Sequence, residues 1–166
     1  QVPPTRRHDR DGVVIDEYYV PVARAGCYVP GGRARYPSTV LMTVVPARVA
    51  GVDDVVLCTP PGPDGQVPVA TLAAAAIAGA DEVYRIGGAQ AIGALAHGTE
   101  SLRPVDVIVG PGNVYVSQAK RQVTGLVGVP AAFAGPSEVV VIGDDTVPAE
   151  LCAPDIVVQA EHGPGG

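Results

Sequence analysis

Short apolar runs recur along most of the 166-residue chain, and each one ends at a turn rich in glycine or proline. Runs of this length with many β-branched residues are typical of buried strands. They predict strands at residues 54–58, 82–86, 105–109 and 139–142.

The stretches between these runs have the composition of helices. Helices are predicted at residues 39–50, with Ser38 as the cap, and at 67–80, 89–97 and 113–127. Strands that alternate with helices in this way imply βαβ units and a parallel sheet. Ligands of such sheets bind beyond the carboxyl ends of the strands, so the loops at 87–88 and 110–112 are candidate site loops.

The two ends of the chain follow a less regular pattern. Residues 1–11 are polar and basic and are predicted to be a loop or arm, while residues 13–22 predict an edge strand or an extended lead-in. Near the other end, Pro148 fits the first turn of a last helix. Pro154 would interrupt that helix, which predicts either a kink or a new start that runs to Glu161.

Composition and charge narrow the class of protein. The chain is 47% hydrophobic with no tryptophan and one phenylalanine, which suits a core of parallel strands and Ala-rich helices. A net charge of −6 argues against a nucleic-acid or anionic-membrane partner. No apolar run reaches the ~18 residues of a membrane span, so we expect a soluble cytoplasmic protein. Cys27, Cys58 and Cys152 lack Cys-x-x-Cys spacing and predict packing rather than a disulfide framework.

Three positions beside glycine-rich turns could carry binding chemistry. Gln90 follows Gly87-Gly88, which is either a structural turn or a loop that offers N–H groups to an anion, without the Gly-x-Gly-x-x-Gly fingerprint. Asn113 follows Gly110-Pro111-Gly112 and is either a helix cap or a ligand contact. Tyr28 precedes a Pro-Gly-Gly turn and is explained either by packing or by contact with a ligand.

Polar residues near the end of the chain also have two interpretations each. Ser137 is either a turn hydroxyl or a residue that contacts a bound molecule. Gln159 and His162 are three residues apart and share one face of a helix, so they could form half of a metal site, although a histidine near a helix C-terminus is favoured by the dipole anyway. Lys120 and Arg121 are predicted to be surface charges on their helix.

Eight motifs follow one another along the chain. They are Tyr28-Val-Pro-Gly-Gly, Pro37-Ser-Thr-Val-Leu-Met, Pro46-Ala-Arg-Val-Ala-Gly, Gly87-Gly-Ala-Gln-Ala-Ile, Gly110-Pro-Gly-Asn, Ala119-Lys-Arg-Gln-Val, Ala134-Gly-Pro-Ser-Glu and Gln159-Ala-Glu-His-Gly-Pro. Together and in this order they resemble histidinol dehydrogenase, and the resemblance covers about residues 13–164.

The resemblance implies a fold, an activity and a set of site residues. The fold is an α/β class with a Rossmann-like parallel sheet and flanking helices, followed by the first strand and helix of a truncated second α/β domain. The activity is oxidation of L-histidinol to L-histidine through an aldehyde, with NAD and one zinc ion. The implied contacts are NAD at Tyr28, Gln90 and Asn113, substrate at Ser137, Gln159 and His162, and zinc at Gln159 and His162.

The same resemblance divides the chain and shows where it departs from the family. The implied parts are an arm at 1–22, an NAD-side domain at 23–136 and the opening of a second domain at 137–166. The family's catalytic Glu-His pair and its other zinc ligands come from a later segment, so no catalytic residue is expected here and the isolated chain is expected to be inactive. Residues 129–133 also lack the family's usual Asp, and Pro154 replaces a small residue.

The resemblance also implies binding partners, and two alternative functions stay open beside it. The intact family is dimeric, so a homodimer or a complementing C-terminal chain is expected, with L-histidinol as the small-molecule substrate. A related zinc and NAD enzyme that acts on another small alcohol is an open alternative. A catalytically dead binding or interaction module is a second one.

Overall fold

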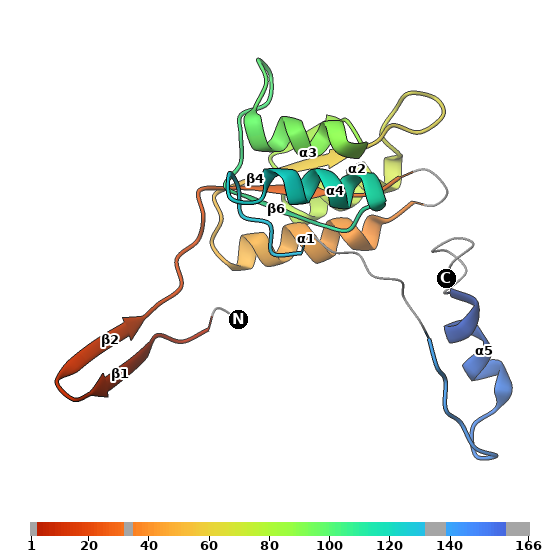
Figure 1. The fold of residues 1–166 in the computed structure, drawn as a ribbon. Coiled ribbons are helices and arrows are strands. Elements are labelled where there is room, and N and C mark those ends of the chain that lie inside the picture. Colours follow the sequence, from red (N-terminus) through yellow and green to blue (C-terminus); the bar gives the residue numbers. More distant parts are fainter. Residues whose placement is uncertain (1–2, 32–34, 132–138, 159–166) are drawn as a thin grey trace. The chain divides into compact units, whose positions relative to one another are not determined.

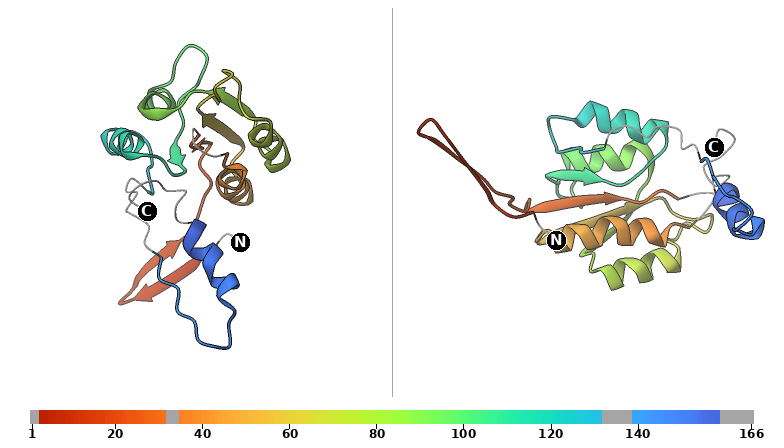
Figure 2. Two further views of the ribbon diagram at one scale, coloured as in Figure 1. Left: turned by 90° about the vertical axis from the view of Figure 1, so that its right-hand side faces the viewer. Right: turned by 90° about the horizontal axis from the view of Figure 1, so that it is seen from below.

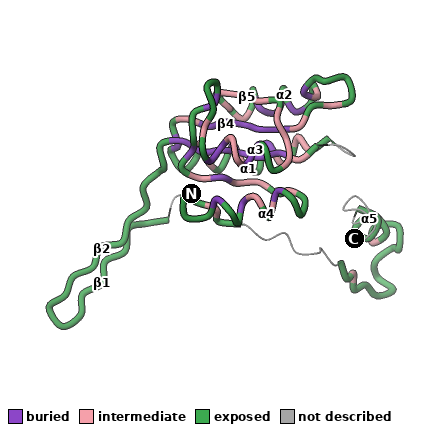
Figure 3. The backbone as a smooth tube through the Cα atoms, turned by 45° about the horizontal axis from the view of Figure 1, so that its top comes forward, coloured by how far each residue is buried: buried purple, intermediate pink, exposed green. Residues whose placement is uncertain are grey.

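The computed structural model describes residues 3–31, 35–131 and 139–158. The chain divides into two compact units, Gln1–Ala132 and Phe133–Gly166. None of the described helices is both long and apolar enough to cross a membrane. All of the buried residues in the described part of the chain belong to the first unit, which positions the candidate site (Figure 3).

A four-stranded parallel sheet forms the centre of the first unit (Figure 1). Its strands lie in the order β5-β4-β3-β6, so the chain builds the sheet in one direction from β3 and then returns to the other side of β3. The parallel α/β class predicted from the sequence is confirmed. The strands are β3 (Arg24–Tyr28), β4 (Asp54–Thr59), β5 (Glu82–Arg85) and β6 (Val107–Val109).

Helices cover both faces of this sheet (Figure 2). Helices α1 (Pro37–Val49) and α2 (Val69–Ala78) lie on one face, and α3 (Gly88–His97) and α4 (Val114–Val123) lie on the other. Alternate residues of β4 enter the two cores, with Val55 and Leu57 on the α1 side and Val56 and Cys58 on the α3 side. Burial on both faces explains why this strand is a continuous apolar run.

The central strand β3 was not predicted, because its sequence, Arg-Ala-Gly-Cys-Tyr, does not read as an apolar run. All five residues are nevertheless buried. The Arg24 guanidinium forms ion pairs with Asp54 and Glu82, which start the two strands beyond it. A β-carbon on Gly26 would lie 2.8 Å from Leu95 Cδ2, so glycine lets α3 pack directly on the strand.

The N-terminal segment forms a β-hairpin, where a loop or arm was predicted for residues 1–11 and an edge strand or an extended lead-in for residues 13–22. Strands β1 (Arg6–Arg10) and β2 (Val13–Glu17) pair antiparallel, and all of their residues are exposed. Asp11 and Gly12 both have positive φ, as a two-residue hairpin turn of the Asp-Gly type requires. That dipeptide was the sequence signal for the hairpin.

Several helix boundaries differ from the prediction. Ser38 does not cap α1, because the helix already begins at Pro37 with Tyr36 as its N-cap residue. Helix α4 ends at Val123 and not at residue 127, and the chain turns at Gly125, where φ is +97°.

The second unit also differs from the prediction. Residues 139–142 form no strand, and Val140 and Ile142 are exposed. An apolar run becomes a strand only when a neighbouring strand pairs with it, and the described part of this unit supplies none. Helix α5 (Ala149–Val157) continues through Pro154, so of the two alternatives given for this proline, a kink or a new start, the new start is wrong.

Candidate functional site

The carboxyl ends of the four parallel strands bring the sequence-predicted loops to one edge of the sheet. The strand order reverses between β3 and β6, which makes this pair the topological switch point of the sheet. Open α/β sheets bind their ligands outside the carboxyl ends of the strands at such a point. Tyr28 ends β3, and Gly110 directly follows β6, so both predicted motifs flank this position.

The backbones at the switch point are in direct contact. Gly110 has a φ of +105°, and a β-carbon built on it would lie 2.0 Å from the carbonyl oxygen of Tyr28. No other residue type could occupy this position without moving the chain. The approach fixes the spacing between the end of β3 and the Gly110–Asn113 loop.

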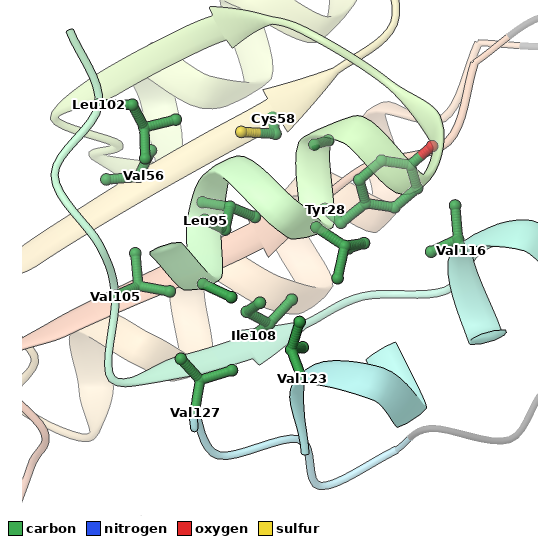
Figure 4. Close-up of a cluster of buried hydrophobic side chains, with 13 residues drawn as sticks. Tyr28, Val56, Cys58, Leu95, Leu102, Val105, Ile108, Val116, Val123 and Val127 are labelled. Carbon is green, nitrogen blue, oxygen red and sulfur yellow. The ribbon is translucent and has the colours of Figure 1, made fainter. Parts of the chain in front are cut away.

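Tyr28 lies at one end of the buried apolar cluster beneath α3 and α4 (Figure 4). It is 4% exposed, which fits the packing interpretation of this residue. Its hydroxyl oxygen accepts a hydrogen bond from the backbone N–H of Gly88 at 3.1 Å, and burial raises the pKa of the phenol. The phenol therefore stays protonated near neutral pH and keeps one proton to donate.

The Gly87-Gly88 turn starts α3 and holds the third predicted motif. A β-carbon on Gly87 would lie 2.5 Å from the Cβ atom of Pro60, so this turn packs against the loop that follows β4. Gly88 has a φ of +67°, and a β-carbon there would lie 2.9 Å from Gln90 Oε1. The exposed Gln90 amide therefore lies over the residue that hydrogen-bonds to Tyr28.

Asn113 caps α4, as one of its two interpretations predicted. Its Oδ1 atom accepts hydrogen bonds from the backbone N–H groups of Tyr115 and Val116, each at 3.1 Å. The side chain is exposed, and capping uses only its oxygen. The amide NH₂ group is therefore left to donate outward from the loop.

The structure also contains a buried cation that the sequence reading placed on the surface. Lys120 is 2% exposed, and its Nζ atom donates hydrogen bonds to the carbonyl oxygens of Gly110 and Ala131. Its burial lowers the pKa of the ammonium group. The missed signal is its spacing, because Lys120 occupies the helical apolar stripe between Val116 and Val123.

A polar hollow of about 320 Å³ lies beside the same edge of the sheet. Proline-rich turns after β3 and β4 line it, together with residues at the starts of α1 and α2. Arg35 and Asp64 contribute charges, and the buried Thr59 and Thr71 contribute hydroxyls. The strand-end edge thus offers hydrogen-bond donors, acceptors and a concave surface, which are the properties of a small-molecule site.

The residues predicted to contact substrate and zinc cannot be placed in the same way. Ser137, Gln159 and His162 lie outside the described residues. Within residues 3–31, 35–131 and 139–158, no cluster of three or more His, Cys, Asp or Glu side chains could hold a metal ion.

Comparisons with known proteins all point to the same family. The family model for histidinol dehydrogenase matches residues 1–166. The chain is 57% identical over 155 residues to the histidinol dehydrogenase of Methanothermobacter thermautotrophicus and 58% identical over 154 residues to that of a Synechococcus species. These matches cover 93% of this chain but only 36% and 35% of the two relatives.

A solved structure agrees with the sequence matches. The crystal structure of histidinol dehydrogenase from Elizabethkingia anophelis superposes with a TM-score of 0.86 at 42% sequence identity. The match covers 98% of this chain and 38% of that one. The chain thus spans about a third of the length of the curated relatives it matches.

Proposed function

The chain belongs to the histidinol dehydrogenase family, and from this premise we propose that the carboxyl edge of its parallel sheet binds NAD. The observation that carries the proposal is the meeting of Tyr28 and Gly110 at the switch point of the sheet. We further propose that residues 23–136 are the NAD-side domain and that residues 137–166 open the next domain.

The described residues carry hydrogen-bonding groups that suit a dinucleotide. Asn113 keeps an amide NH₂ to donate, Gln90 presents an exposed amide on the first turn of α3, and the Tyr28 phenol keeps its proton. Amides and hydroxyls of this kind hydrogen-bond to the ribose, carboxamide and phosphate oxygens of a nucleotide. The Gly87-Gly88 turn lets a ligand approach the backbone at the start of α3.

For the whole protein we propose NAD-dependent oxidation of L-histidinol to L-histidine through histidinaldehyde, in histidine biosynthesis. NAD supplies the hydride acceptor when it is bound. The residues of this chain bind and orient the dinucleotide and exclude water on one side of it. We propose that Ser137, Gln159 and His162 contact the substrate, that the last two also ligate zinc, and that the intact protein is a homodimer.

Activity of a chimera tests this function. Residues 1–166 would replace the matching segment of the Methanothermobacter relative, and NADH formation from histidinol would be followed by absorbance. We expect turnover in the chimera, a higher KM for NAD after Asn113→Ala, and no turnover from residues 1–166 alone. Turnover with another small alcohol but not with histidinol would overturn the proposed substrate. A properly folded chimera without any NAD-dependent activity would overturn the proposed enzyme function.

A further inference from the structure

Lys120 is a buried cation whose partners in the described structure are all neutral. Its Nζ atom donates to the carbonyl oxygens of Gly110 and Ala131, and none of the carboxylates among the described residues forms an ion pair with it. Removing an ammonium group from water is costly, and carbonyl dipoles repay only part of that cost. An apolar side chain of similar length would fill the same space without this penalty.

Stability alone therefore does not account for a lysine at this position. Val116 and Val123 lie on the same buried stripe of α4 and are packed in the apolar cluster, where a methionine in place of Lys120 would also pack. Unlike a methionine, the lysine supplies a pair of directed, charge-assisted hydrogen bonds to two separate loops. The lysine therefore differs from a methionine in the position that it gives to those two loops.

Of the two loops that Lys120 contacts, the one that contains Gly110 lies at the switch point of the sheet. Gly110 starts this loop and lies against the backbone of Tyr28. Asn113 ends the loop and caps α4, the helix that carries Lys120. The loop is thus fixed at one end by the cap and at the other by the bond from Lys120 to the Gly110 carbonyl.

We propose that Lys120 is a positioning residue for the dinucleotide site, which holds the Gly110–Asn113 loop so that Asn113 and Tyr28 keep a fixed spacing. This inference rests on the proposed NAD site. Lys120 itself does not contact the dinucleotide. It acts through Asn113 and Tyr28, which do. Loss of its hydrogen bonds would leave the fold intact and spread the loop over several positions, which weakens binding.

Calorimetric titration of this chain with NAD tests the proposal. Lys120→Met should raise the Kd for NAD about tenfold, which corresponds to about 1.4 kcal/mol, while urea unfolding shows no loss of stability. Lys120→Arg keeps the charge and the donors and should restore most of the affinity. The matched control is Arg121→Met, which removes an exposed cation one residue later and should leave the Kd within about twofold.

The outcomes separate this inference from the function on which it rests. If the unmodified chain binds NAD and Lys120→Met binds it equally well, the positioning role is wrong and the NAD site stands. An equal loss in Lys120→Met and Arg121→Met would also overturn the role, because overall charge would then explain it. If the unmodified chain does not bind NAD, the NAD site fails, and amide hydrogen exchange decides the role of Lys120. Faster exchange at Tyr115 and Val116 in Lys120→Met, with β4 unchanged, would support loop positioning, and unchanged exchange would refute it.

Discussion

The hydroxyl of Tyr28 accepts a hydrogen bond from the backbone N–H of Gly88 at 3.1 Å, although the two residues are sixty positions apart in the chain. This bond ties the end of β3 to the start of α3, two elements that β4 and β5 separate in the sequence. Two of the loops that we assign to the dinucleotide site are therefore joined through one phenol.

Tyr28→Phe tests the strength of this connection. The ring stays in the apolar cluster, but the N–H of Gly88 loses its acceptor, so we expect a loss of about 0.5–1.5 kcal/mol in the free energy of unfolding. Urea denaturation would measure it. The control is Tyr115→Phe, which removes an exposed hydroxyl and should change stability by less than about 0.5 kcal/mol. Equal effects in the two variants would mean that the Tyr28 hydroxyl contributes nothing specific.

Gly110→Ala should be one of the most destabilising small substitutions in the chain. Its β-carbon would lie 2.0 Å from the Tyr28 carbonyl oxygen, and its φ of +105° already disfavours any other residue. We expect a loss of at least about 2 kcal/mol, measured by thermal or urea unfolding.

Gly125→Ala separates the two causes of that loss. Gly125 has a similar φ of +97°, but nothing lies within 4 Å of its β-carbon position. This control should therefore cost only the backbone term, about 1 kcal/mol. If Gly110→Ala costs no more than Gly125→Ala, the close approach of the two backbones is not present in solution.

The buried Arg24 network predicts how stability changes with pH. Hydrogen bonds from Arg24, and then from Tyr84, lower the pKa of Glu82 below its ordinary value of 4.5. A carboxylate with a depressed pKa in the folded state contributes stability above the ordinary pKa, and this contribution is lost as pH falls through the folded value. The free energy of unfolding should therefore fall as the pH drops below 4.5.

Arg24→Met removes the cation from that network and should change the pH profile as well as the stability. Near neutral pH we expect a loss of about 3 kcal/mol or more, because Asp54 and Glu82 are left without their buried partner. In acid the Glu82 carboxylate is protonated, so the difference between variant and parent should shrink. Urea unfolding at both pH values measures this, and an equal loss at both would contradict the ion-pair account.

A strand could be read from the sequence where its burial comes from its own apolar residues. Strand β4 is an example, since five of its six residues are buried and four of those five are apolar. Strand β3 could not be read in this way. Its burial depends on carboxylates supplied by Asp54 and Glu82, and on a glycine that admits Leu95 from a distant helix. Residues 139–142 show the opposite case, because an apolar run does not become a strand without a neighbour.

Part of the candidate site was predictable from local patterns, and part was not. The cap at Asn113 followed from its place after a Gly-Pro-Gly turn. The close approach of Gly110 to Tyr28 depends on tertiary packing that no local pattern encodes. The burial of Lys120 had a local signal in its spacing from Val116 and Val123, but its two carbonyl partners come from loops that the spacing does not identify. The roles of Tyr28, Gln90 and Asn113 as NAD contacts come from the family resemblance, and they stay predictions.

Calorimetric titration with NAD tests the central claim most directly. The parent chain, Gln90→Ala, Asn113→Ala and the control Gln122→Ala, which changes an exposed glutamine on the same helix as Lys120, would be compared at one salt concentration. We predict measurable binding by the parent and the control, and binding weakened about fivefold or more in the two site variants, as expected when about 1 kcal/mol of contact is lost. Unchanged binding in both site variants, or no binding by the folded parent chain, would contradict an NAD site at the carboxyl edge of the sheet.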